Sequence, residues 1–182
     1  MALNATIFKV ELNVADMDRF YYADHSLTIA RHPSETDERM MVRLLAFALH
    51  AHERLEMGRG IGMVEEADLW QRDLTGRIET WIDVGLPDDK RVRKASGQSE
   101  RVIVYAYGGR GAELWWSKIK SELARCRNLT VYALSRETTD AITAMAQPRM
   151  ELQLLVQEGD LWLACGDRRV LVVRETWQEP RD

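Results

Sequence analysis

The first part of the chain alternates apolar and polar residues. Residues 5–14 (ATIFKVELNV) show this alternation imperfectly, and residues 24–30 (DHSLTIA) follow further along the chain. A period of two is typical of a strand with one buried face. The first segment therefore predicts a strand, with the second as its hairpin partner. The apolar positions of the first strand are Ile7, Val10, Leu12 and Val14.

The pattern changes to helical spacing in residues 34–55. Pro33 and Ser34 precede this segment, and several acidic residues lie in its first turn, where they stabilise the positive end of a helix. The sequence therefore predicts a long helix over 34–55. Its apolar stripe comprises Met40, Met41, Leu44, Leu45, Ala48 and Leu49.

The middle of the chain alternates strand and helix patterns. Residues 78–85 (IETWIDVG) favour a strand, residues 88–98 carry acids early and bases late as a helix does, and residues 101–107 are a nearly continuous apolar run. The order repeats with a helix over 113–126 and a strand over 128–134. Such βαβ units place their strands in parallel.

The C-terminal part predicts antiparallel strands. After a short helix near 136–146, residues 150–165 and 168–177 contain apolar segments divided by turns at Gly159-Asp160 and Gly166-Asp167. Together the patterns predict an α/β fold with a mixed central sheet flanked by helices. The length of 182 residues and the 46% hydrophobic content suit a single domain over 1–182.

Charge and cysteine content restrict the function. A formal net charge of -4 argues against coating nucleic acid by bulk electrostatics, so any nucleic-acid site would be local. Cys126 and Cys165 lie far apart without CxxC spacing, which favours reduced thiols over a zinc site or a disulfide. The N-terminus does not resemble a signal peptide, and no apolar run approaches ~18 residues. We therefore expect a cytoplasmic protein without a membrane segment.

Candidate chemistry lies at the end of the strand over 78–85. Alternation places Glu79, Trp81 and Asp83 on one face. Open α/β sheets present ligands beyond the carboxyl ends of their strands, and Mg²⁺ prefers carboxylate oxygens, so Asp83 is the better metal ligand. Glu79 lies ~13 Å further back and would serve in structure or in a binding groove with Trp81. Without further information, such acids are more often solvated or paired with Lys and Arg.

Polar residues on both sides of this strand complete the candidate site. Asp68 lies upstream in EEADLW, and Lys94 and Gln98 lie downstream, four residues apart on one face of the predicted helix. Arg110 lies in a glycine-rich turn before a helix and is a weaker candidate for contacting a nucleic-acid backbone. The charged residues of segment 31–43 favour a capping and ion-pair network over a substrate clamp.

The order of these residues resembles the PD-(D/E)XK nuclease superfamily. More closely, the segments ARHPSETDERMMVRLLAFALHAHERL and DLWQRDLTGRIETWIDVGLPDDKRVRKASGQ resemble the YaeQ family of small bacterial proteins, and the likeness spans essentially the whole chain. The resemblance implies a restriction-endonuclease-like core. It places Glu53 at the helix glutamate, Ala67-Asp68 at the Pro-Asp step, and Asp83-Val84-Gly85 at (D/E)xK. Glycine stands at the lysine position, so Lys94 is the candidate for a displaced lysine.

The resemblance implies a mechanism and leaves two functions open. Asp68 and Asp83, with Glu53 nearby, would hold Mg²⁺, while Lys94 stabilises the transition state and Gln98 binds a phosphate oxygen. The first function is a Mg²⁺-dependent nuclease or phosphodiesterase, which the retained acids and Lys94 favour. The second is a catalytically inactive nuclease-like module that binds nucleic acid or protein. The acidic net charge and the missing lysine favour this second function.

Overall fold

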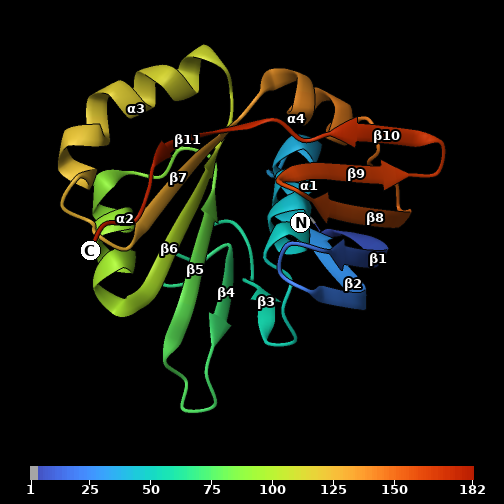
Figure 1. Cartoon of the computed structure of the whole chain (residues 1–182), viewed down its shortest axis with the longest axis horizontal. Coiled ribbons are helices and arrows are strands. Elements are labelled where there is room, and N and C mark those ends of the chain that lie inside the picture. Colours follow the sequence, from blue (N-terminus) through green and yellow to red (C-terminus); the bar gives the residue numbers. More distant parts are fainter. Residues whose placement is uncertain (1–3) are drawn as a thin grey trace. The chain divides into compact units, whose positions relative to one another are not determined.

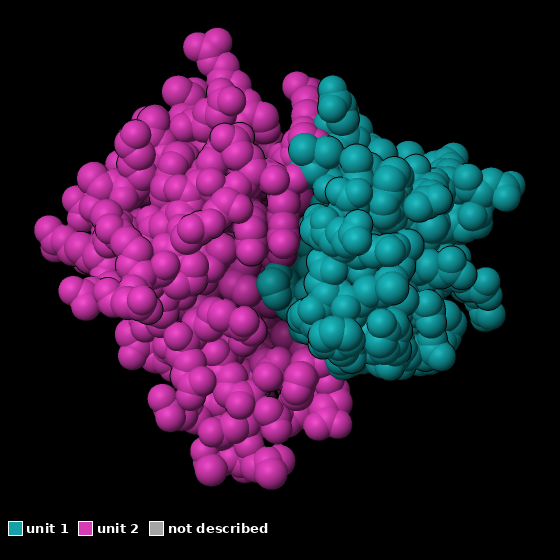
Figure 2. Space-filling model, in the orientation of Figure 1, with its two compact units in different colours: residues 1–51, 137–173 teal, residues 52–136, 174–182 magenta. Residues whose placement is uncertain are grey.

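A computed structural model describes residues 4–182, and its chain divides into two compact units. Unit 1 extends to Ala51 and includes Glu137–Val173, whereas unit 2 comprises His52–Arg136 and Arg174–Asp182 (Figure 2). No helix within residues 4–182 is long and apolar enough to cross a membrane. Each unit contains its own mixed sheet and two helices, so the expected α/β class is present.

Unit 1 is built on a five-stranded sheet with the order β10-β9-β8-β1-β2 (Figure 1). The predicted N-terminal hairpin is confirmed, since β1 and β2 pair antiparallel from end to end. β1 also pairs with β8 in parallel, while β8, β9 and β10 form an antiparallel meander. The elements of this unit are β1 (Thr6–Asp16), β2 (Tyr21–Arg31), α1 (Asp37–Leu49), α4 (Arg136–Thr143), β8 (Arg149–Gln157), β9 (Asp160–Cys165) and β10 (Arg168–Leu171).

Helix α1 is shorter than predicted at both ends. Thr36 caps it, its side chain accepting a hydrogen bond from the backbone N–H of Arg39, and the helix ends at Leu49 with His50 as C-cap. The prediction of a helix to residue 55 was wrong because the helical spacing of apolar residues stops at Leu49. Glu53 therefore lies in a turn after the helix and not on it.

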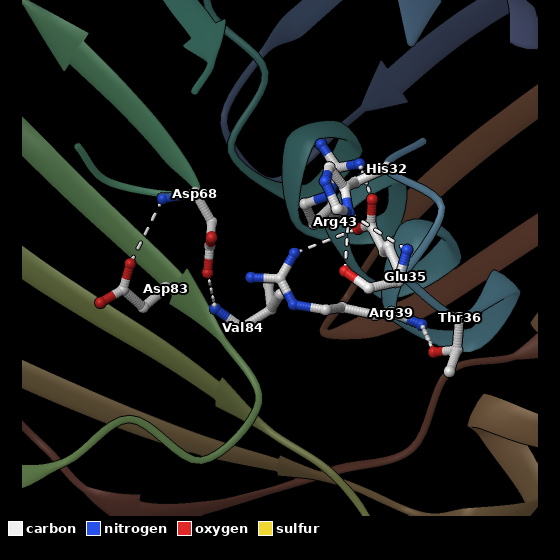
Figure 3. Close-up of polar contacts among 9 residues, drawn as sticks. His32, Glu35, Thr36, Arg39, Arg43, Asp68, Asp83 and Val84 are labelled. Carbon is white, nitrogen blue, oxygen red and sulfur yellow. Dashed lines mark hydrogen bonds and ion pairs between the residues drawn. The ribbon is translucent and has the colours of Figure 1, made fainter. Parts of the chain in front are cut away.

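A buried ion-pair network fixes the start of α1. The Glu35 carboxylate accepts hydrogen bonds from Arg43 at 2.7 and 2.8 Å and from Arg39 at 3.0 Å (Figure 3). The side chains of Glu35 and Arg43 are 0% and 3% exposed. Charges removed from water are tolerated only when they are paired in this way. The ion-pair network expected in segment 31–43 is thus present.

Unit 2 is built on a six-stranded sheet with the order β11-β7-β6-β5-β4-β3 (Figure 1). The central strands β5, β6 and β7 are parallel, as the βαβ pattern predicted, and the remaining neighbours pair antiparallel. The elements are β3 (Leu55–Met57), β4 (Leu69–Arg72), β5 (Ile78–Val84), α2 (Asp89–Gln98), β6 (Ser99–Ala106), α3 (Arg110–Leu123), β7 (Leu129–Leu134) and β11 (Arg174–Gln178).

Helices α2 and α3 cover one face of the unit 2 sheet. Their inward side chains pack against alternate residues of the parallel strands, and three half-buried tryptophans cover this layer. Burial of such apolar surface is the main stabilising contribution to a domain of this kind. The buried cluster comprises Ala67, Trp81, Val92, Ala95, Val102, Val104, Leu123, Cys126, Leu129 and Val131, with Trp115, Trp116 and Trp177 packed against it.

The strands form two sheets where the sequence predicted one central sheet. The C-terminal meander accordingly ends at β10, and β11 pairs with β7 of the other sheet. Periodicity identifies strands but not their partners, because pairing depends on contacts between distant segments. Both cysteines are free, with Cys126 buried and Cys165 partly buried.

One close backbone approach fixes the segment that leads to β4. The backbone N–H of Gly58 donates to the carbonyl of Asp68 at 2.8 Å, and a Cβ atom at position 58 would lie 2.0 Å from the carbonyl oxygen of Ala67. Only glycine fits there without moving the backbone beside Asp68.

We expect Gly58→Ala to lower the free energy of unfolding by about 1–3 kcal/mol, the usual cost of overpacking. The matched control is Gly97→Ala in α2, where no heavy atom described in the structure lies within 4 Å of the added Cβ. Because alanine favours a helix over glycine, the control should be neutral or stabilising by up to about 1 kcal/mol. Urea unfolding of both variants measures the difference. Equal stability of the two would contradict the close approach.

Candidate functional site

Asp83 is the penultimate residue of β5 and faces helix α2. It shares this face with Trp81, as the alternation predicted, and it is only 1% exposed. Gly85 follows with a φ of +96°, a conformation that glycine adopts without strain, and the side chain of Asp88 caps α2. The strand therefore turns directly into a helix whose first turn lies against Asp83.

Asp68 lies beside Asp83 through a reciprocal pair of backbone contacts (Figure 3). The backbone N–H of Asp68 donates to Oδ1 of Asp83 at 3.3 Å, and the backbone N–H of Val84 donates to Oδ2 of Asp68 at 2.8 Å. Asp68 is 8% exposed. The structure thus brings together the two acids that the sequence proposed as metal ligands.

The cation next to Asp83 is Arg91, from the first turns of α2. Its Nε and Nη2 donate to Oδ2 and Oδ1 of Asp83 at 2.7 and 2.9 Å, which is the bidentate geometry of a strong arginine–carboxylate pair. The same guanidinium donates to the carbonyls of Val64 and Glu66 at 3.1 and 2.7 Å, and it lies 5.5 Å from the ring centroid of Trp81. Arg91 therefore joins β5, α2 and the segment before β4.

The site as arranged does not fit Mg²⁺. Both oxygens of Asp83 already accept hydrogen bonds from Arg91, and Oδ2 of Asp68 accepts one from Val84. A Mg²⁺ ion is held by free carboxylate oxygens, and it keeps other coordination positions open to water and phosphate. Across residues 4–182, no three His, Cys, Asp or Glu side chains are grouped so that they could hold a metal ion.

Three residues assigned catalytic roles from the sequence lie on the surface. Lys94 is 47% exposed and pairs with Glu65, which is 77% exposed. Gln98 is exposed at the last position of α2. Glu53 is exposed in the turn before β3. The ion-pair partner of Lys94 is thus a surface glutamate and not the buried acids.

Glu79, although it shares a strand with Asp83, has separate partners. Its Oε2 accepts hydrogen bonds from Gln71 and Arg54, both at 2.8 Å. The hydrogen bond from Gln71, followed by that from Arg54, lowers the pKa of Glu79 below its ordinary value. Glu79 therefore stabilises the contact between β5 and its neighbouring segments.

Trp81 and Arg110 differ in accessibility. Trp81 is 1% exposed and packs edge-on against Trp70, with ring centroids 6.0 Å apart. Its indole N–H is buried without an acceptor among the residues that the structure describes. Arg110 is exposed at the first position of α3.

A pocket of about 360 Å³ adjoins the Asp83–Arg91 pair. Three cationic side chains of α2 line it, together with one carboxylate and an apolar wall. Pockets of this size accommodate small ligands. The lining residues are Val64, Trp81, Asp88, Lys90, Arg91 and Lys94.

The sequence-based reasoning missed Arg91, although a signal was available. The inward face of α2 contains Val92 and Ala95, both fully buried. Arg91 is adjacent to Val92 and four residues before Ala95, so helical spacing places it at the margin of that face. Lys94 was preferred because the resemblance required a lysine.

Comparisons with known proteins give one consistent result. A model of the YaeQ protein family matches residues 1–174. The uncharacterised protein YaeQ of Escherichia coli K12 is 43% identical over 180 residues, covering 99% of both chains, and that of Salmonella typhi is 42% identical over the same length and coverage.

Two solved structures are similar over nearly the whole chain. The crystal structure of the YaeQ protein from Xanthomonas axonopodis pv. citri has a TM-score of 0.92 and 48% identity, covering 97% of this chain and 99% of that one. The YaeQ protein from Pseudomonas syringae also has a TM-score of 0.92, with 33% identity and 98% coverage of both chains.

The geometry predicts that substitutions of Arg91 and Lys94 lower the free energy of unfolding by unequal amounts. Arg91→Ala leaves the Asp83 carboxylate buried without its cation, and this should lower the free energy of unfolding by about 3–5 kcal/mol. Lys94→Ala removes an exposed pair and should cost about 1 kcal/mol or less. Chemical denaturation of both variants tests the difference.

The double variant Arg91→Met/Asp83→Asn provides the control for lost packing. It removes the charge of Asp83 together with that of Arg91, so it should be more stable than Arg91→Ala. If Arg91→Ala were as mild as Lys94→Ala, the structural role assigned to the Arg91–Asp83 pair would be wrong.

Proposed function

The chain belongs to the YaeQ family, and we propose that its unit 2 is a restriction-endonuclease-like module that binds nucleic acid without cleaving it. The proposal rests above all on the Arg91–Asp83 pair. A guanidinium lies where the resemblance to metal-dependent nucleases would require a divalent cation. The module keeps the acidic residue near the end of β5, but the charge of this Asp83 is neutralised by Arg91 of the same chain.

The order of elements in unit 2 supports the nuclease-like part of the proposal. Strands β3, β4 and β5 pair antiparallel in sequence order, and α2 then crosses to β6, which is parallel to β5. Asp68 immediately precedes β4, and Asp83 is the penultimate residue of β5. These are the positions that the Pro-Asp and (D/E)xK motifs would occupy.

The proposed absence of catalytic turnover follows from the partners of the carboxylate oxygens in the site. Phosphodiester cleavage by such sites requires activation of a water molecule and neutralisation of the charge that develops on the phosphate. The Asp83 oxygens are instead hydrogen-bonded to Arg91, and Gly85 replaces the motif lysine. In this arrangement Arg91 engages both carboxylate oxygens of Asp83 in place of a metal ion.

Nucleic-acid binding is supported by the lysines of α2 that line the pocket. Lys90 and Lys94 are both exposed, and their helix also carries Arg91 and Arg93. With a net charge of -4, the chain offers no general attraction for phosphates, so binding would depend on this local group. Two phosphate contacts predict a modest slope of log K against log salt, about -1.4 for single strands.

A second candidate, a Mg²⁺-dependent nuclease or phosphodiesterase, is favoured by one observation. Asp68 and Asp83 are buried side by side, with Lys94 on the following helix. For this function, a cation would have to displace Arg91 from Asp83.

The two candidates differ in a direct assay of binding and cleavage. Labelled single-stranded DNA, double-stranded DNA and RNA are incubated with the full chain, with Mg²⁺, Mn²⁺ or EDTA. We expect binding that weakens with salt, unchanged by EDTA, and intact substrate throughout. Lys90→Ala/Lys94→Ala should weaken binding, whereas Arg93→Ala, which removes a charge from the same helix outside the pocket, should have a smaller effect.

Cleavage that requires a metal and is lost in Asp83→Asn would overturn this proposal and support the second candidate. Failure to bind any of the three nucleic acids would contradict both.

A further inference from the structure

We propose that the pocket lined by Lys90, Arg91 and Lys94 binds the terminal phosphate monoester of a nucleic-acid strand. This inference rests on the proposed function, and it specifies which part of the nucleic acid enters the site. Four observations on unit 2 carry it: the size of the pocket, its exposed lysines, its apolar wall and one unpaired buried donor.

The pocket suits one terminal group. Its volume of about 360 Å³ lies at the small end of the range for ligand sites. Val64 and the ring of Trp81 contribute apolar surface, and the charged side chains come from one helix, α2. A nucleotide presents the same combination of a flat apolar ring and a charged phosphate.

The lining charges favour an anion, and two of them are available to it. Arg91 is committed to Asp83 by two hydrogen bonds, so its charge is largely compensated. Lys90 and Lys94 are exposed, and the pair of Lys94 with Glu65 lies at the surface, where ion pairs contribute little. Asp88 is the one lining carboxylate, and it accepts a hydrogen bond from the backbone N–H of Arg91 as helix cap.

A terminal monoester matches two lysines better than an internal phosphodiester does. A monoester carries a charge of about -1.5 to -2 near pH 7 and three terminal oxygens, whereas each internal phosphate carries a single charge. Lys90 and Lys94 are four residues apart on α2, so their side chains lie on one face and can approach the same group.

Trp81 supplies the independent observation. It is 99% buried and forms part of the pocket wall, yet its indole N–H has no acceptor within the described chain. Buried donors without partners are uncommon in folded proteins, and the side chain that carries this one lines the pocket, so a small shift of the ring would let a ligand supply the acceptor. A nucleotide offers such acceptors on its base and on its phosphate.

The test compares strands that differ only at their ends. Fluorescence anisotropy with the full chain measures binding of one single-stranded octanucleotide in three forms: 5′-phosphorylated, 3′-phosphorylated and unphosphorylated, each with an internal label. We expect at least one terminal phosphate to tighten binding about tenfold, the scale of a charge-assisted hydrogen bond. The two phosphorylated forms identify which end is bound.

Three variants assign that gain to the pocket. Lys90→Ala/Lys94→Ala should abolish the difference between phosphorylated and unphosphorylated strands, whereas Arg93→Ala, whose side chain pairs with Asp89 outside the pocket, should preserve it. Glu65→Ala releases Lys94 and should tighten binding of the phosphorylated strand about two- to fivefold, an increase that general loss of structure cannot produce.

Equal affinity for all three strands would overturn the inference and leave the proposed function intact. Absence of binding by every strand would overturn both. A terminal-phosphate preference that survives in Lys90→Ala/Lys94→Ala would place the phosphate elsewhere and also contradict the inference.

Discussion

The Arg91–Asp83 ion pair is the interaction on which unit 2 depends. Asp83 lies near the end of β5 and is 1% exposed, so its charge must be compensated within the chain. Arg91 provides this compensation and also donates to two carbonyls of the segment before β4. One guanidinium therefore joins a strand, a helix and a loop. Without it, the Asp83 carboxylate would be a buried charge that accepts a 3.3 Å hydrogen bond from the backbone N–H of Asp68, which would stabilise it poorly.

This pair also determines what the site can do. Metal-dependent phosphodiesterases use carboxylates as ligands for a cation that remains open to substrate. Here the charge that compensates Asp83 belongs to Arg91, which is held in bidentate geometry, and under the proposed function it activates no water molecule. The positive side chains that remain accessible are the lysines of α2, at the margin of the pocket. Under the proposed function, binding of phosphate and loss of turnover would both follow from one replacement, in which α2 and not the solution supplies the cation.

Local sequence pattern accounts for much of the fold and for part of the site. Periodicity predicts three features that depend on residues near one another in the sequence. They are the N-terminal hairpin, the βαβ units and the face shared by Trp81 and Asp83. The separation into two sheets cannot be predicted in this way, because β1 pairs with β8, which lies far along the chain. The helix over 34–55 was too long because its apolar stripe already ends at Leu49, and the residues that follow form a turn. Arg91 was missed because four of the five residues over 90–94 are cationic, and the resemblance directed the choice to Lys94.

The most direct measurement is the effect of Mn²⁺ on the thermal unfolding of wild type and Arg91→Ala. If the guanidinium takes the place of a cation, millimolar Mn²⁺ leaves the Tm of the wild type unchanged, because no carboxylate oxygen of Asp83 is open to it. The same Mn²⁺ raises the Tm of Arg91→Ala, where the buried acids lack compensation and binding to the folded state stabilises it. An increase in the wild-type Tm that is abolished by Asp83→Asn would contradict the account, since it would show that the native site binds the metal.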